Sequence, residues 1–230
     1  MLPLYTGPQV TVCIGSTSQE FKFPKALLCK QSPYFAATFN GKFKEGKEQS
    51  TTLEEINGVV STQSFQMLAQ WICLGRVVFS APKSQESQES ISAAIEFARL
   101  ADMCGVTGMN SMIAAHIKQV IMADADPRHL KATSKRNHRA NTFCITPQHI
   151  ISAANLSVGH PVRKMLANSA VEECLYTREF KFIKESREVP GFATDLLQAV
   201  KITLDTMVFE SGGAKIKEPI SGMMLRLGVS

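Results

Sequence analysis

The sequence lacks any uninterrupted apolar run of the length that a membrane-spanning helix needs, which is about 18 residues or more. Its first residues, MLPLYTGPQV, lack the basic region and the apolar region of a secretory signal. The overall composition is that of an ordinary folded chain, with 44% apolar residues and a mean hydropathy of −0.01. These features predict an intracellular protein of the cytoplasm, the nucleus or both, without a membrane partner.

Sequence signatures of catalysis and of cofactor or metal binding are also missing. There is no GxSxG, no P-loop, no GxGxxG and no HExxH. The five histidines lie 9 to 13 positions apart, which is not the paired spacing of a zinc site, and His116 fits a satisfied histidine on a helix face. We expect no enzyme, no catalytic residue, no cofactor and no metal, and a Cys/His nucleophile has no positive support.

The cysteines form no CxxC pair, and this absence argues against a redox motif or a disulfide framework. Four of the six lie among apolar residues: Cys13, Cys29, Cys73 and Cys104. Reduced, buried thiols are typical of an intracellular protein.

Positive charge is concentrated in one short segment. Residues 1–126 carry 10 basic and 11 acidic residues, residues 127–145 carry 5 and 0, and residues 146–230 carry 10 and 9. The net charge of +5 therefore arises from PRHLKATSKRNHRANTFCI alone. The rest of the chain gives no sign of a broad basic face.

The first 60 residues show strand and helix signals in close succession. Alternating apolar residues predict a hairpin over 9–23. A short helix follows Pro24, and Ser32-Pro33 is a strong start signal for a second helix that carries Phe35 and Phe39 on one face. We expect Gly41 to end this helix in the left-handed conformation.

Further along, residues 51–56 and 77–79 read as strands, and Ser61 caps a long helix that Gly75 ends. Two more helices complete an α+β domain over residues 1–123, of the usual domain size. Residues 124–145 read as a basic loop or linker, residues 146–210 as an all-α extension that starts at Thr146-Pro147, and residues 211–230 as a weakly structured, flexible tail.

Five segments in this order resemble the BTB/POZ domain over about residues 9–123: QVTVCIG, FKFPKALLC, SPYFAATFNGKFKEG, SFQMLAQWICLGRVVF and AIEFARLADMCGVTGM. The resemblance implies a short mixed sheet capped by a cluster of helices, followed here by the all-α extension. That extension is similar to the helical half of small stand-alone BTB proteins of filamentous fungi.

What the resemblance implies for function is a non-catalytic protein–protein interaction module. Such modules form homodimers or heterodimers, and many serve as dimerising substrate adaptors in cullin-3 ubiquitin ligase complexes. The alternative is a transcription- or chromatin-associated scaffold that uses the basic segment. Protein partners and self-association are therefore expected, with cullin-3 as one candidate partner.

The family's dimer pocket contains an Asp before the first strand and a His-Lys pair, and the sequence departs from this pattern at two positions. Gln9 replaces the Asp and Pro24 replaces the His, whereas Lys25 is kept. A buried lysine without its carboxylate is costly. We therefore expect Lys25 to reach toward water, and the family's usual dimer surface to be altered.

Phe43-Lys44-Glu45 is similar to the φ-x-E motif that cullin-binding members carry in the loop after their third helix. An apolar anchor that fills a partner's pocket, with a carboxylate at the rim, can carry much of a binding energy. The alternative is that Phe43 packs on its own domain and Glu45 is solvated.

The basic segment has two readings. Its cations, Arg128, Lys131, Lys135, Arg136 and Arg139, could contact phosphates or an acidic import receptor. Only Phe143 is close enough in sequence to stack on a base, so a solvated loop is favoured and nucleic acid is the less favoured partner.

Overall fold

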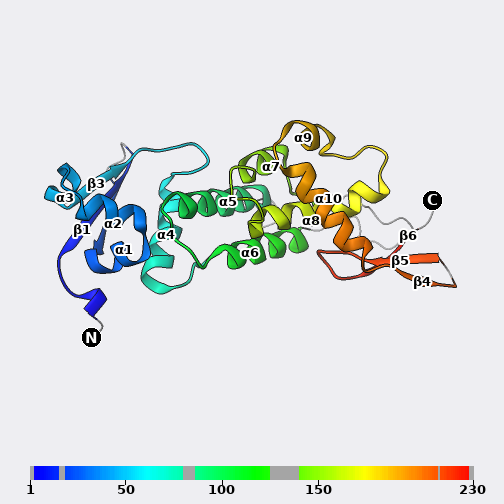
Figure 1. Cartoon of the computed structure of the whole chain (residues 1–230), viewed down its shortest axis with the longest axis horizontal. Helices are drawn as coiled ribbons and strands as arrows, with labels where there is room; N and C mark the ends of the chain where they lie inside the picture. Colours follow the sequence, from blue (N-terminus) through cyan, green and yellow to red (C-terminus); the bar gives the residue numbers. More distant parts are fainter. Residues whose placement is uncertain (1–2, 16–18, 80–85, 125–139, 212, 228–230) are drawn as a thin grey trace. The chain divides into compact units, whose positions relative to one another are not determined.

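In the computed structural model of the chain, the N-terminal hairpin is part of a three-stranded sheet of order β2-β1-β3 (Figure 1). β1 (Gln9–Ile14) runs antiparallel to β2 (Gln19–Pro24) and parallel to β3 (Ser50–Leu53). Val10, Val12 and Ile14 alternate with more exposed residues along β1 and are buried. The period-two pattern of the sequence is thus the buried face of this sheet.

The structure describes residues 3–15, 19–79, 86–124, 140–211 and 213–227. The chain divides into two compact units: residues 1–80 with 92–110, and residues 81–91 with 111–230. In the described part of the chain, no helix is long and apolar enough to cross a membrane.

Local start and stop signals explain the helices of the first unit. After the short 3-10 helix η1 (Pro3–Tyr5), its α-helices are α1 (Lys25–Gln31), α2 (Pro33–Asn40), α3 (Lys44–Glu48), α4 (Thr62–Leu74) and most of α5 (Ser87–Met103). The Ser32 hydroxyl accepts a hydrogen bond from the N–H of Phe35, and Ser61 forms a capping box with Ser64. Gly75 ends α4 with a φ of 66°, as predicted.

Aromatic rings fill the centre of the first unit. Phe35 and Phe39 stack with ring centroids 6.1 Å apart, as their spacing on one helix face predicts. Phe65 contacts three rings edge-on, at 4.8 Å from Phe21, 6.1 Å from Phe23 and 6.4 Å from Phe35. The cluster joins β2, α2 and α4 in one core.

Two predictions for the first unit are wrong. Residues 77–79 form no strand, whereas the strand predicted over 51–56 is present as β3, which ends at Leu53. Gly41 ends α2 in an extended conformation, with φ −70° and ψ 167°, and not in the left-handed one. A Cβ at Gly41 would lie 2.9 Å from the carbonyl oxygen of Ala37, so a lack of space explains this glycine.

The second unit is mainly helical. It contains α6 (Asn110–Ala123), α7 (Pro147–Ala153), α8 (Pro161–Tyr176), α9 (Ile183–Glu188) and α10 (Phe192–Leu204), with a 3-10 turn, η3 (Ala140–Thr142). The predicted start at Thr146-Pro147 is confirmed, and Thr146 forms a capping box with His149. α8 also begins with a proline, Pro161.

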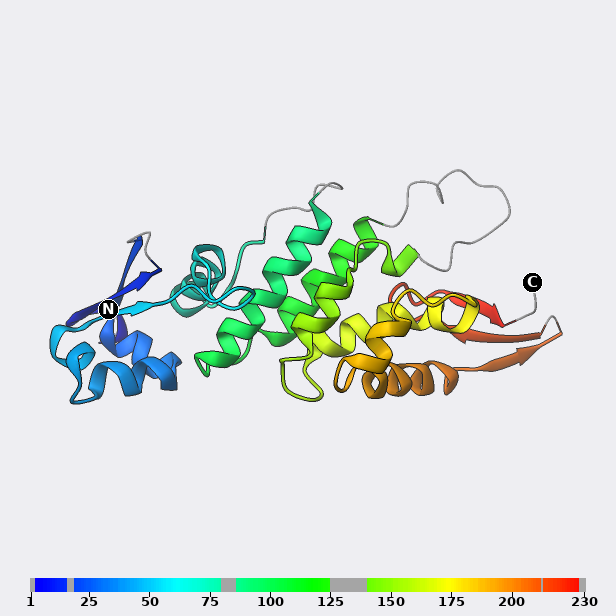
Figure 2. The same cartoon turned by 90° about the horizontal axis from the view of Figure 1, so that it is seen from above.

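The extension is not all-α, contrary to the prediction. β4 (Val208–Glu210), β5 (Gly213–Lys217) and β6 (Met224–Leu227) form an antiparallel sheet of order β4-β5-β6 (Figure 2). Residues 213–227, predicted as a weakly structured tail, therefore belong to the fold. Ile216 and Leu225 are register partners and both are buried, which explains why this sheet forms.

Candidate partner-binding surface

Phe43 lies at the start of the short helix α3, where the close approach of two glycines fixes the backbone. It occupies the N-cap position, and its carbonyl oxygen accepts a hydrogen bond from the N–H of Lys47 at 3.2 Å. A Cβ on Gly46 would lie 2.1 Å from the carbonyl oxygen of Gly41. Only glycine at position 46 lets the chain turn this tightly.

The Phe43 side chain is 80% exposed, so it does not pack on its own domain. Glu45 lies in the first turn of α3 and is half-buried. Tyr34, on α2, lies close enough that the Glu45 carboxylate contributes to raising the pKa of its phenol, after burial and Cys104. An exposed ring and, two positions further on, a carboxylate thus lie at the start of one short helix.

Lys25 does not reach toward water, so this expectation is wrong. Its Nζ donates a hydrogen bond to the carbonyl oxygen of Phe39 at 2.9 Å. The Nε2 of Gln49, which has a left-handed φ of 53°, donates to the same oxygen at 3.2 Å. Cations are favoured at helix C-termini, and here the carbonyl at the end of α2 takes the place of the carboxylate that the family pattern supplies.

Gln9 is exposed at the start of β1 and pairs in register with Pro24. The Lys25 N–H donates to the carbonyl oxygen of Pro8 at 2.9 Å, so the backbones of the two predicted pocket residues are neighbours. In the described structure no hydrogen bond joins their side chains. No sequence signal marked Gln49 as the residue that completes this helix end.

The cations of the basic segment, Arg128, Lys131, Lys135, Arg136 and Arg139, lie outside the described residues. The residues that follow them are described. The Lys181 Nζ donates to the carbonyl oxygens of Thr142 and Ile145, both at 2.7 Å, and the Thr142 hydroxyl donates to the buried Glu173. These contacts attach residues 142–145 to α8 and to the segment between α8 and α9.

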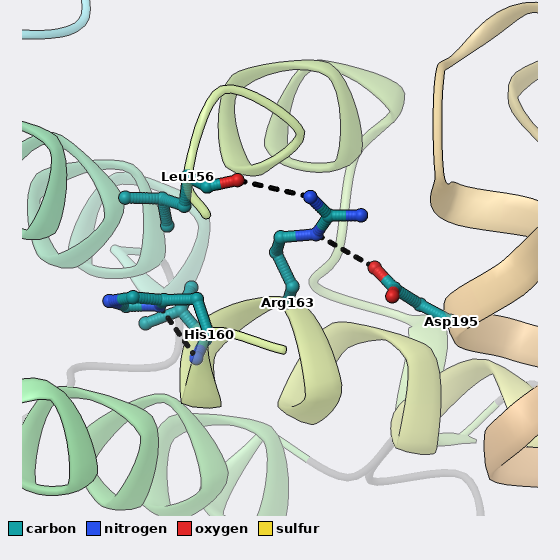
Figure 3. A network of polar contacts seen from close by, with 5 residues as sticks. Leu156, His160, Arg163 and Asp195 are labelled. Atoms are coloured by element: carbon teal, nitrogen blue, oxygen red, sulfur yellow. Dashed lines mark hydrogen bonds and ion pairs between the residues drawn. The ribbon is translucent and has the colours of Figure 1, made fainter. Parts of the chain in front are cut away.

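Buried polar side chains hold the second unit together. The Arg163 Nε donates to Asp195 at 2.8 Å, and its Nη1 donates to the carbonyl oxygen of Leu156 at 3.0 Å (Figure 3). His160 caps α8, because its Nδ1 accepts a hydrogen bond from the N–H of Val162 at 3.2 Å. Gly191 leaves room for the guanidinium, since a Cβ there would lie 2.4 Å from the Arg163 Nη2.

Two other histidines of the second unit are engaged in structural hydrogen bonds. His149 Nδ1 accepts from the N–H of Thr146 at 3.1 Å, and its Nε2 lies 3.1 Å from the carbonyl oxygen of Gln88. Burial lowers the pKa of His149 to about 4. His116 is buried on α6, with its Nε2 3.0 Å from the Ser90 hydroxyl, which agrees with the predicted helix-face histidine.

The thiols are free. Burial raises the pKa of Cys104 and of Cys144 to about 12, so both are protonated at neutral pH and are poor nucleophiles. Across the residues that the structure describes, no three His, Cys, Asp or Glu side chains are grouped so that they could hold a metal ion.

The comparison with family models agrees with the fold of the first unit. Residues 6–107 match the model described as BTB/POZ domain. This part of the chain is therefore a BTB/POZ domain, built from the mixed sheet and its surrounding helices, and a mainly helical region with a small sheet follows it. BTB/POZ domains are protein–protein interaction modules that self-associate and are usually non-catalytic. No curated protein matches the chain.

Proposed function

We propose that the protein is a dimerising adaptor that docks onto a cullin-3 type scaffold through Phe43 and Glu45. The observation that carries the proposal is the 80% exposure of Phe43 on a turn whose backbone has little freedom. A large apolar side chain held in solvent gains free energy when a partner covers it, and little conformational entropy is lost when it is already well positioned. The contact chemistry is an aromatic anchor with a carboxylate beside it.

The second unit supplies a separate surface, and its role in the proposal is to select the protein that the adaptor presents. Its helices resemble the extension of the stand-alone BTB proteins noted above. The division of the chain into two compact units is consistent with two tasks, scaffold docking and partner selection.

Binding to the N-terminal domain of cullin-3 tests the docking proposal. The full chain is compared with the double variant Phe43→Ala/Glu45→Ala, and the dissociation constant is measured by calorimetry. A matched control is Leu74→Ala/Glu54→Ala, which removes an apolar side chain and a carboxylate that are also exposed in the first unit. We expect the first variant to bind at least about tenfold more weakly and the control to bind like wild type.

Light scattering tests the self-association part separately. We expect a mass of twice the 25.2 kDa of one chain. A monomer at all accessible concentrations would reject the dimer but would leave the docking proposal standing.

A further inference from the structure

The second unit contains a cavity of about 530 Å³ whose walls come from α6, α8, α10 and the turn between β5 and β6. Small-molecule sites in proteins typically measure about 300–1,000 Å³. Its position is far in sequence from Phe43, and all its lining residues belong to the second unit. The cavity is therefore a candidate site that is independent of scaffold docking.

Three lysines from three different elements line this cavity: Lys118 on α6, Lys164 on α8 and Lys217 at the end of β5. None of them forms an ion pair with another residue that the structure describes. Each ammonium group therefore keeps its charge available to a ligand. Positive charges gathered around a concave surface concentrate anions there.

The two carboxylates of the lining do not neutralise the lysines. Asp195 is paired with Arg163 at 2.8 Å. The Glu218 carboxylate is buried and accepts hydrogen bonds from the Asn141 amide at 3.0 Å, from the N–H of Ile220 at 2.7 Å and from Ser221, through both its N–H and its hydroxyl. Asp195 is neutralised by Arg163, whereas Glu218 keeps its charge because its donors are neutral. The three lysines outnumber this one carboxylate, so the net field in the cavity is positive.

The remaining walls supply neutral donors and an apolar patch. Asn168, one turn beyond Lys164 on α8, and Gln198 on α10 line the cavity, and their amides make no hydrogen bond to other described residues. Ile202, which is 57% exposed, and Pro219 cover another side. The cavity can thus hold a ligand that is anionic at one end and apolar at the other.

We propose that this cavity binds a small organic phosphate that carries two or three phosphate groups. Three lysine ammonium groups offset much of the negative charge of such a ligand, and lysine is a common partner of phosphate oxygens. The apolar wall at Ile202 and Pro219 receives the organic part. No cysteine or histidine is among the lining residues, and the proposed binding needs no metal ion.

Calorimetry on the full chain at low ionic strength tests the proposal, with ATP and inorganic tripolyphosphate as probes. We expect saturable one-to-one binding of both, weaker in high salt because the attraction is electrostatic. The variant Lys118→Gln/Lys164→Gln/Lys217→Gln is expected to bind at least about tenfold more weakly. Lys201→Gln is the matched control, because Lys201 is an exposed lysine of α10 outside the cavity, and it should bind like wild type.

Thermal unfolding of each variant checks folding. Stabilisation by ATP of wild type and Lys201→Gln, but not of the triple variant, gives a second readout. Absence of binding at millimolar probe, or an equal loss in Lys201→Gln, would overturn the site. Citrate binding as tightly as tripolyphosphate would overturn the assignment to phosphate. A phosphoserine peptide binding more tightly than ATP would overturn the assignment to a small molecule. These outcomes do not depend on cullin binding.

Discussion

Each of the two units is stabilised internally by a different set of contacts. Among the described residues of the first unit, the buried polar side chains are Ser32 and Ser64, and both serve in helix caps. The second unit buries charged or titratable groups in several places: His116, Asp124, His149, His160, Arg163, Glu172, Glu173, Glu185 and Glu218. The first unit is therefore stabilised by apolar packing around its aromatic cluster, whereas the second adds satisfied polar pairs to its apolar core. Such pairs are sensitive to the loss of one partner.

The largest expected effect is in the first unit. Phe65→Ala removes the ring that contacts Phe21, Phe23 and Phe35, and leaves a cavity in the aromatic cluster. We expect the free energy of unfolding of this unit to fall by about 3–5 kcal/mol. Denaturant unfolding followed by aromatic fluorescence or near-UV circular dichroism measures it. Phe209→Ala, at an 82% exposed ring, is the control, and an equal loss there would contradict the packing account.

In the second unit, Asp195→Ala leaves the Arg163 guanidinium buried without its carboxylate. We expect a loss of about 3 kcal/mol in unfolding free energy, because an unpaired buried charge is costly. The double variant Arg163→Met/Asp195→Leu replaces the pair by apolar side chains and should recover most of this loss. If the single and double variants lose the same unfolding free energy, the unpaired charge of Arg163 is not the cause of the loss.

Gly46→Ala tests the turn that presents Phe43, because the added Cβ would lie 2.1 Å from the carbonyl oxygen of Gly41. The turn must shift, at a cost of about 1–3 kcal/mol. We expect scaffold binding to weaken although Phe43 and Glu45 are both present. Gly75→Asn, at a left-handed position with no atom within 4 Å of a Cβ, is the control and should leave binding unchanged. Unchanged binding in Gly46→Ala would show that the turn geometry is unimportant.

The smallest expected effect is a pH dependence confined to the second unit. The pKa of His149 is about 4 in the folded protein, below its ordinary value of 6.5, so the unfolded chain binds the proton more readily. Stability is therefore full above pH 6.5 and is lost as the pH falls toward 4, by about 1–2 kcal/mol at pH 5. His149→Gln should flatten this part of the stability profile, as measured by urea unfolding at several pH values. An unchanged slope would mean that other groups cause it.

Sequence patterns predicted the structure correctly where it depends on residues that are close together in the chain. Ser32-Pro33, Ser61 and Thr146-Pro147 mark helix starts because a cap needs only residues two or three positions away. The spacing of Phe35 and Phe39 likewise predicts one buried face. These local rules, in order, predict most of the BTB/POZ domain.

The patterns failed where partners are distant or where apolar residues are few. Nothing near Lys25 indicates that its ammonium group reaches the carbonyl of Phe39, and Asn141 and Glu218 are 77 positions apart. The Gly-rich composition of the tail concealed β5 and β6. Val77-Val78-Phe79 suggested a strand, yet Val78 is 70% exposed and no strand pairs with it in the described structure.

The most direct test of the central proposal is the ratio of dissociation constants for the cullin-3 N-terminal domain between Phe43→Ala/Glu45→Ala and wild type, with thermal stability measured in parallel. Because Phe43 is 80% exposed, its loss should barely alter the unfolding temperature. We predict a ratio of about ten or more at unchanged stability. Equal affinity of the two proteins, or no binding by wild type, would contradict it.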